Sequence, residues 1–247
     1  MMRPVIWSFG GGTQSVAIAV LVAQGKLPKP DRIVMADTGR EATETWEYLE
    51  NVIRPMGFDV EIVGHEYATV DLFSGNGDVL LPMYTPDGGR LSSYCSNEWK
   101  KRPIERWLRD HGYSSANPIT NWLGISVDEI HRAKPNATGW IENHWPLLLD
   151  VPLRRDECRA LVAEYGLPQP PRSSCWMCPH RGDEQWKRLR DHYPEDWDRA
   201  IDLEREVQAK KDPFVFLHGS RKTLGDADLN DSQADLFPDC DGGYCFV

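Results

Sequence analysis

The stretch PVIWSFGGGTQSVAIAVLVAQG, residues 4–25, decides the expected fold. Residues 4–9 are mostly β-branched and aromatic, which predicts a buried strand that ends where the glycines begin. Residues 16–25 are apolar and close on Gly25, which predicts a helix. A strand, a glycine-rich turn and a helix in this order are typical of the first unit of an open α/β sheet.

The alternation of strands and helices continues along the chain. Strands are predicted over 32–37, 58–64, 117–126 and, at one edge, 144–152. The repeated β-α-β order favours a doubly wound, Rossmann-like parallel sheet of about five strands. Helices are expected over 41–57, 96–111, 153–166 and, in two pieces broken near Pro194, 183–210.

Two parts are expected within the 247 residues. Residues 1–152 would form the nucleotide-binding domain, with a long loop or small insertion over 65–94. Residues 153–247 would form a C-terminal extension, with a Cys-x-x-Cys loop, helices and a tail, packed on the first part.

The formal net charge of −10 argues against a general nucleic-acid binder, whose surface is usually basic. Any contact with tRNA or DNA must therefore use a local patch, for which residues 100–109 (KKRPIERWLR) are the best candidate. The alternative is that this run is only the solvated face of a helix.

No apolar run approaches the ~18–20 residues that a membrane span needs, and the N-terminus lacks the pattern of a signal peptide. We therefore predict no membrane partner and a cytoplasmic location. Thiols stay reduced there, so the six cysteines are better interpreted as chemistry or metal ligands than as disulfides.

The glycine-rich turn is the first candidate site. Main-chain N–H groups of glycines and of a helix N-terminus can approach phosphate oxygens closely. The turn is neither the dinucleotide fingerprint nor a Walker loop, and the alternative is a merely tight turn. The predicted nucleotide-binding residues here are Ser8, Gly10, Gly11, Gly12, Thr13, Gln14 and Ser15.

Asp37 follows the second predicted strand, at the same sheet edge as the glycine-rich turn. It could accept a hydrogen bond from a ribose hydroxyl or an adenine amine. The alternative is an N-cap, with Asp37 or Thr38 opening the helix near Glu41.

Cys175 and Cys178 have the spacing that lets two thiolates face one metal centre. Cys95 is a third candidate ligand and Cys245 a fourth, with Cys240 or a non-cysteine group as alternatives. A [4Fe–4S] cluster, zinc, a redox dithiol and an inert pair all remain open. Cys158 is expected to pack in an amphipathic helix.

Residues 10–15 resemble the PP-loop signature S-G-G-x-D-S, with Gly10 in place of Ser and Gln14 in place of Asp. Residues 93–108 resemble the C-T-x-x-x-K-x-x-P segment of the phosphoadenosine phosphosulfate reductase branch, through Cys95, Lys100 and Pro103. Residues 122–133, which include Gly124, resemble its G-I-R-x-D-E-S-x-R segment.

Within residues 122–133, Glu129 and Arg132 match the family segment, and Ser126 replaces its arginine. The chain is thus similar to the phosphoadenosine phosphosulfate reductase-like, or adenine nucleotide alpha hydrolase-like, family over roughly residues 5–190. The resemblance implies nucleotide contacts from Gly124 and catalytic roles for Cys95, Lys100 and Arg132. For Arg132 the alternative is a helix-start salt bridge.

The resemblance implies ATP, or phosphoadenosine phosphosulfate, as ligand and Mg²⁺ as cofactor, although Gln14 cannot ionise as the usual aspartate does and leaves magnesium-dependent cleavage open. We favour an ATP pyrophosphatase that adenylates a substrate, such as a nucleobase in tRNA or DNA, and transfers sulfur through a cysteine-bound cluster. One alternative is a phosphosulfate reductase that uses Cys245 and a thioredoxin-like reductant. Another is a non-catalytic nucleotide-binding protein. We also expect a sulfur donor as a partner and a second copy of the chain in a homodimer.

Overall fold

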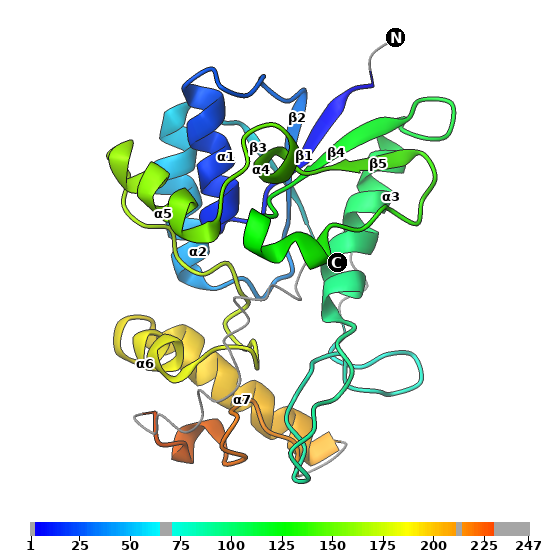
Figure 1. Ribbon diagram of the computed structural model, residues 1–247. Coiled ribbons are helices and arrows are strands. Elements are labelled where there is room, and N and C mark those ends of the chain that lie inside the picture. Colours follow the sequence, from blue (N-terminus) through cyan, green and yellow to red (C-terminus); the bar gives the residue numbers. More distant parts are fainter. Residues whose placement is uncertain (1–2, 65–70, 211–213, 230–247) are drawn as a thin grey trace.

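The computed structural model describes residues 3–64, 71–210 and 214–229. Its centre is a five-stranded sheet in the order β3-β2-β1-β4-β5, and every neighbouring pair of strands is parallel (Figure 1). The doubly wound α/β sheet expected from the sequence is confirmed. The strands are β1 (Val5–Ser8), β2 (Arg32–Ala36), β3 (Val60–Val63), β4 (Ile119–Leu123) and β5 (Ile141–His144).

Helices cover both faces of the sheet. Figure 1 shows α1 (Thr13–Ala23), α2 (Thr43–Tyr48) and α5 (Arg155–Glu164) on one side and α3 (Arg102–Asp110) on the other. Helix α2 continues as a π-helix (Leu49–Ile53) and a 3-10 turn (Arg54–Met56), and α3 is preceded by a π-helix (Asn97–Lys101).

The burial of alternate strand residues explains these layers. Along β1, Trp7 belongs to the core beneath α1 and α5, whereas Ile6 belongs to the core beneath α3. Successive side chains of a strand point to opposite faces, so strands covered on both sides are apolar throughout. This is why the run at 4–9 lacks polar alternation.

A second lobe lies below the sheet in Figure 1 and has its own core. Helices α6 (Asp183–His192) and α7 (Pro194–Lys210) and the 3-10 turn η6 (Leu224–Asp226) pack there against residues 72–91. Helix α5 instead contributes Cys158 and Val162 to the core beneath α1. The division at residue 152 stays a prediction. The core beneath α1 and the core of the second lobe both draw on residues from the two sides of it.

Two local expectations are wrong. The edge strand ends at His144 rather than spanning 144–152, and Pro146 begins the short helix α4 (Pro146–Leu149). Proline suits the first turn of a helix, where no N–H partner is needed. Neither Asp37 nor Thr38 caps α2, because that helix starts at Thr43 after Ala42, which makes no side-chain cap.

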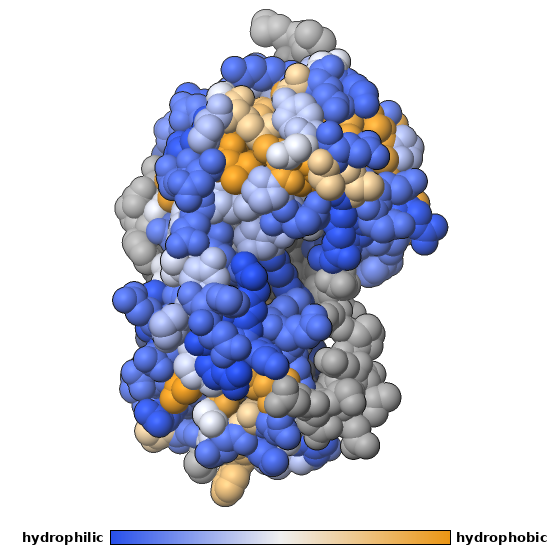
Figure 2. Space-filling view, turned by 90° about the vertical axis from the view of Figure 1, so that its left-hand side faces the viewer, coloured by the Kyte–Doolittle hydropathy of each residue, from blue (hydrophilic) through white to orange (hydrophobic). Residues whose placement is uncertain are grey.

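Figure 2 shows the face that carries α1, α2 and α5. Hydrophilic residues predominate around the narrowing between the lobes, and hydrophobic residues gather over the upper, sheet-bearing lobe. Within the described part of the chain, no helix has the length and apolar character needed to cross a membrane.

Candidate nucleotide and thiol site

The site lies at the point where the order of strands in the sheet reverses: β2 and β3 follow β1 on one side, and β4 and β5 lie on the other. Strand β1 has β2 on one side and β4 on the other, so the connections after β1 and β3 leave a crevice at the carboxyl ends of β1 and β4. Open α/β sheets bind ligands at such a point. Residues 10–12 lead from β1 into α1, whose N-cap Gly12 makes no side-chain hydrogen bond. The first N–H groups of α1 therefore have no side-chain cap, as an anion site requires.

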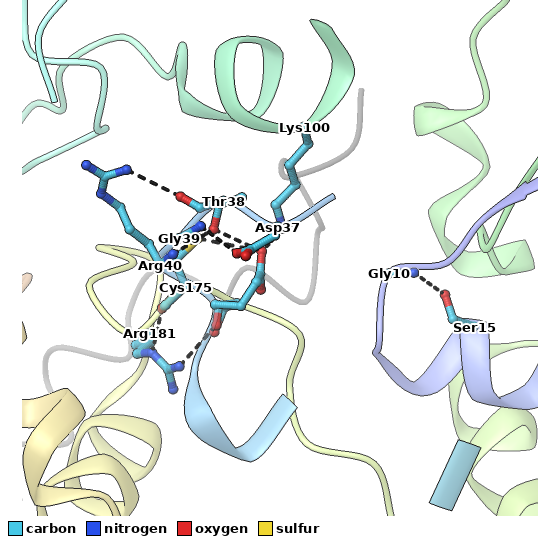
Figure 3. Close-up of polar contacts among 11 residues, drawn as sticks. Gly10, Ser15, Asp37, Thr38, Gly39, Arg40, Lys100, Cys175 and Arg181 are labelled. Carbon is cyan, nitrogen blue, oxygen red and sulfur yellow. Dashed lines mark hydrogen bonds and ion pairs between the residues drawn. The ribbon is translucent and has the colours of Figure 1, made fainter. Parts of the chain in front are cut away.

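Two glycines let the backbone segments at this point approach closely. Gly11 has φ +73°, and a Cβ there would lie 2.8 Å from Thr45 Cγ2. A Cβ on Gly124, just after β4, would lie 3.2 Å from the backbone nitrogen of Ser15. Ser15 in turn closes the loop, because its Oγ accepts a hydrogen bond from Gly10 N at 3.0 Å. Figure 3 shows this last contact.

A pocket opens directly onto the glycine-rich loop, and most of the predicted nucleotide-binding residues line it. They are Ser8, Gly10, Gly12, Thr13, Gln14, Ser15 and Gly124. The pocket is also lined by Arg132, Arg155, Arg172, residues 173–174 and Cys178. Three guanidinium groups and a helix N-terminus thus surround one space, which suits a ligand with several negative charges.

Glu129 organises the arginine side of this pocket. Its Oε2 accepts from Arg132 Nη1 at 2.7 Å and from Gln14 Nε2 at 3.2 Å. Its Oε1 lies 3.6 Å from Arg155 Nη1. Burial raises the pKa of Glu129, an effect that the two arginines oppose. Arg132 therefore makes the predicted helix-start salt bridge and also faces the pocket.

The buried polar atoms at the pocket include Arg132 Nε and Ser174 Oγ, which have no hydrogen-bond partner among the described residues. The two residues are 8% and 3% exposed. Leaving such groups unsatisfied costs about 1–3 kcal/mol each. A bound ligand that accepts from them would remove this cost.

Asp37 does not line this pocket. Its Oδ1 accepts from Gly39 N at 2.7 Å and so shapes the turn after β2 (Figure 3). Its contact with a nucleoside stays a prediction.

The candidate thiols meet in a second, adjoining pocket. Cys95, Cys175 and Cys178 all line it, together with Lys100 and Ser174. Cys178 is close enough to Cys95 and Cys175 to raise the pKa of both. Ser174 and Cys178 line the anion pocket as well, so the two pockets share a wall.

The Cys-x-x-Cys turn is anchored to the segment that follows β2. Trp176 N donates to Arg40 O at 2.9 Å, and Cys178 N donates to Cys175 O at 3.1 Å within the turn. The buried guanidinium of Arg181 donates to Cys175 O and Ser174 O, at 3.2 and 3.4 Å (Figure 3). These contacts explain why cysteines more than 130 residues after β2 lie at its carboxyl end.

A buried ion pair stands beside Cys175. Lys100 Nζ lies 2.8 Å from Glu41 Oε1, the atom that also accepts from Thr38 Oγ1 at 3.4 Å. Cys175 Sγ lies 3.7 Å from Thr38 Oγ1 and 4.0 Å from Glu41 Oε1 (Figure 3). Lys100 is thus held at the thiol pocket and does not line the anion pocket. Its predicted catalytic role stays a prediction.

The environment of the thiols bears on the alternatives left open by the sequence. Burial is the first cause of a raised pKa at both Cys95 and Cys175. Reactive dithiols of the thioredoxin kind have a lowered thiol pKa instead. The choice among a cluster, zinc, a redox dithiol and an inert pair stays a prediction. Cys158 is fully buried and its pKa is raised to about 12, as expected of a packing residue.

Three thiols line one pocket, and cysteine thiolates, commonly four of them, are the usual ligands of an iron–sulfur cluster. Within the described ranges no cluster of three acidic, histidine or cysteine groups is already arranged to hold an ion. Cys240 and Cys245, the candidates for a fourth ligand, lie outside the described residues. The [4Fe–4S] cluster therefore stays a prediction.

A third pocket lies on the α3 side of the crevice. It shares Ser8, Leu123 and Arg132 with the anion pocket, and Lys101 and Lys134 line it as well. Only part of the basic run 100–109 faces it: Lys100 and Lys101 line the pocket, whereas Arg102, Arg106 and Arg109 do not.

Sequence reasoning missed several residues of the site. Arg155 and Arg172 line the anion pocket, but neither lies in a segment that resembles a family motif. Glu41 supports the thiol pocket, and the sequence indicated it only as the start of a helix. One feature of the sequence could have indicated Arg172: it stands three residues before Cys175, the first cysteine of the Cys-x-x-Cys pair.

No family model and no curated protein matches the chain. Among solved structures, it is similar to a phosphoadenylyl-sulfate (PAPS) reductase from Candida auris, in a phosphate complex, with a TM-score of 0.47. The identity is 12%, over 68% of this chain and 76% of that chain. The assignment of an α/β sheet rests on the strand order of the chain itself.

Proposed function

We propose that the protein is an adenine nucleotide-dependent enzyme of the PP-loop kind, which adenylates a substrate and then exchanges AMP for sulfur. One observation carries the proposal: the anion pocket at the glycine-rich loop and the pocket of three thiols share Ser174 and Cys178. A phosphate-binding site and a sulfur-chemistry site are thereby adjacent, as activation and sulfur transfer in one enzyme require.

In this proposal ATP lies with its pyrophosphate end on residues 10–15. A substrate oxygen attacks the α-phosphorus, an O–P bond forms, and the bond to the β-phosphate oxygen breaks to release pyrophosphate. The N–H groups at the start of α1 and the guanidinium of Arg132 face the charge that develops on the leaving group. Sulfide then attacks the activated carbon, and AMP leaves with the substrate oxygen.

The pocket on the α3 side is the proposed place of the acceptor. It meets the anion pocket at Ser8 and Arg132, and Lys101 and Lys134 give it a basic character. A nucleobase carried by tRNA or DNA, whose backbone is anionic, suits such a pocket. The sequence-based expectation of a local nucleic-acid patch is thereby narrowed to the part of 100–109 that lines it.

Cys95, Cys175 and Cys178 would hold the proposed [4Fe–4S] cluster, with Cys245 as the fourth candidate. Such a cluster would supply a site for binding inorganic sulfur next to the adenylate. Trp99 and Met177, both buried, line the same pocket and would shield such a group from part of the solvent.

The proposal is tested by turnover of radiolabelled ATP by protein purified without oxygen, with sulfide and either tRNA or DNA added. We expect AMP and pyrophosphate in equal amounts, and a strong loss in an Arg132→Met variant. Arg205→Met is the matched control, since Arg205 makes an exposed ion pair with Asp202 in α7. No pyrophosphate with either nucleic acid would refute the adenylation reaction.

A phosphosulfate reductase is the second candidate, favoured by the position of Cys178 within the anion pocket itself. A thiol beside the bound anion could serve a sulfate-bearing nucleotide. Sulfite release from phosphoadenosine phosphosulfate, with thioredoxin as reductant and without pyrophosphate release from ATP, would support this candidate. Tight nucleotide binding with no turnover of either substrate would indicate a non-catalytic protein.

A further inference from the structure

We infer that the nucleotide's phosphates are neutralised by an arginine cradle held by Glu129, and that binding does not depend on Mg²⁺. The inference rests on the proposed nucleotide site and says how that site meets the charge of its ligand. Mg²⁺, the cofactor that the family resemblance implies, does not fit the residues of the anion pocket.

The first ground is the set of oxygen donors. Magnesium is usually bound through one or two carboxylates together with phosphate oxygens and waters. Among the described residues that line the anion pocket, Glu129 is the one carboxylate. The pocket carries three arginines against this single acidic group.

The second ground is that both oxygens of Glu129 already face donors. Oε2 is 2.7 Å from Arg132 Nη1 and 3.2 Å from Gln14 Nε2, and Oε1 is 3.6 Å from Arg155 Nη1. The residue is 4% exposed. A cation would have to displace a guanidinium from a buried carboxylate, so Glu129 serves as the support of the cradle.

The third ground is the identity of residue 14. The Gln14 amide donates to Glu129 and lies within 3.4 Å of Ser126 Oγ. An aspartate at this position would place a second carboxylate near Glu129 and could not donate to it. Like charges in a shared site repel, and each disfavours ionisation of the other. Gln14 therefore fits a loop that binds anions through arginines, and the aspartate of the PP-loop signature would not.

The fourth ground is that the Arg132 guanidinium has a hydrogen-bond donor that no described residue uses. Arg132 Nε is buried without a partner among the described residues, although the terminal Nη1 of the same side chain binds Glu129. A guanidinium can bind two oxygens at once in a fork. A phosphate oxygen at Arg132 would complete its hydrogen bonding.

The test is calorimetric titration of ATP into the wild-type protein, once with excess EDTA and once with excess Mg²⁺. We expect a dissociation constant in EDTA that equals or is lower than the value in Mg²⁺, because free ATP carries more charge for the cradle. Binding that is tenfold or more tighter in Mg²⁺ would overturn the inference.

A Gln14→Asp variant sharpens the test. We expect its affinity for ATP in EDTA to fall about tenfold or more, and part of the loss to be recovered with Mg²⁺. Gln24→Asp is the matched control, because Gln24 is exposed at the other end of α1. Unchanged binding by Gln14→Asp in EDTA would contradict the role given to Gln14.

The failures of this inference and of the proposed function are distinguishable. ATP binding in EDTA with no pyrophosphate formed under any condition supports the cradle and refutes adenylation. Pyrophosphate formation from ATP that binds only with Mg²⁺ supports adenylation and refutes the cradle. Absence of ATP binding in both buffers refutes both.

Discussion

Lys100 Nζ and Glu41 Oε1 lie 2.8 Å apart in a buried ion pair that joins the segment after β2 to the π-helix before α3. Both side chains are nearly closed to solvent, at 10% and 1% exposure. The pair stands beside Cys175, whose Sγ is 4.0 Å from the same Glu41 oxygen. The pair thus joins the π-helix that follows Cys95 to Glu41, and Glu41 in turn forms a backbone bridge with Cys175.

Breaking this ion pair on one side should be costly. A Lys100→Met variant leaves Glu41 as an uncompensated buried charge, and we expect a loss of about 3–5 kcal/mol in the free energy of unfolding. The double variant Lys100→Met with Glu41→Gln should lose clearly less, because neither charge remains. Urea unfolding of the four proteins of this cycle measures the coupling. Additive losses would show that the two side chains do not stabilise one another.

Gly124 should be required for the shape of the nucleotide loop. A Gly124→Ala variant places its Cβ 3.2 Å from the backbone nitrogen of Ser15, so the loop must shift. We expect ATP affinity to fall about tenfold, which corresponds to ~1.4 kcal/mol. Gly139→Ala is the control, because nothing lies within 4 Å of the added Cβ. Equal affinities of the two variants would mean that Gly124 does not shape the site.

The cysteines of the thiol pocket should hold iron. Protein purified without oxygen is expected to contain iron and acid-labile sulfide, both lost in Cys175→Ser and in Cys178→Ser. A Cys158→Ser variant should retain them, since Cys158 packs beneath α1 and α5 and is fully buried. Cys245→Ser tests the fourth ligand in the same assay. Zinc in place of iron would contradict the cluster and leave the thiols as a structural metal site.

Glu204 should stabilise the second lobe through its carboxylate. Its two oxygens accept from Leu217 N at 2.7 Å and Leu224 N at 2.6 Å, and the residue is 1% exposed. In a Glu204→Gln variant one of the two N–H groups loses its acceptor, and we expect a loss of about 1–3 kcal/mol. Urea unfolding measures it.

The pH dependence of that loss has a definite sign. Burial raises the pKa of Glu204 in the folded protein, so the folded state binds a proton more tightly than the unfolded chain. The wild type therefore gains stability relative to Glu204→Gln as the pH falls through the raised folded pKa toward the unfolded value. A difference between the two proteins that is constant over this range would refute the shifted pKa.

The arrangement of the sheet could be predicted because its signals are local. An apolar run such as 4–9 indicates a strand that is buried on both faces. The glycines at 10–12 indicate a tight turn before α1. The break at Pro194 likewise follows from the missing N–H of proline. The prediction placed the edge strand too late in the chain. The apolar run at 147–149 is too short to distinguish a buried strand from a short helix, and it forms part of α4.

The residues that line the anion pocket and the thiol pocket could be predicted only in part. The loop at 10–15 and the cysteines carry recognisable spacing, but Arg155 and Arg172 reach the anion pocket only through the tertiary packing of α5 and of the loop before Cys175. The pairing of Lys100 with Glu41 likewise joins residues 59 positions apart that no local pattern connects.

The most direct measurement is a crystal structure of the protein with α,β-methylene-ATP, which cannot be cleaved between those phosphates. We expect phosphate density on the N–H groups of residues 12–15, within hydrogen-bond distance of the Arg132 guanidinium and close to Cys178. Phosphates bound away from the glycine-rich loop, or a triphosphate held without contact to the arginines of this pocket, would contradict it.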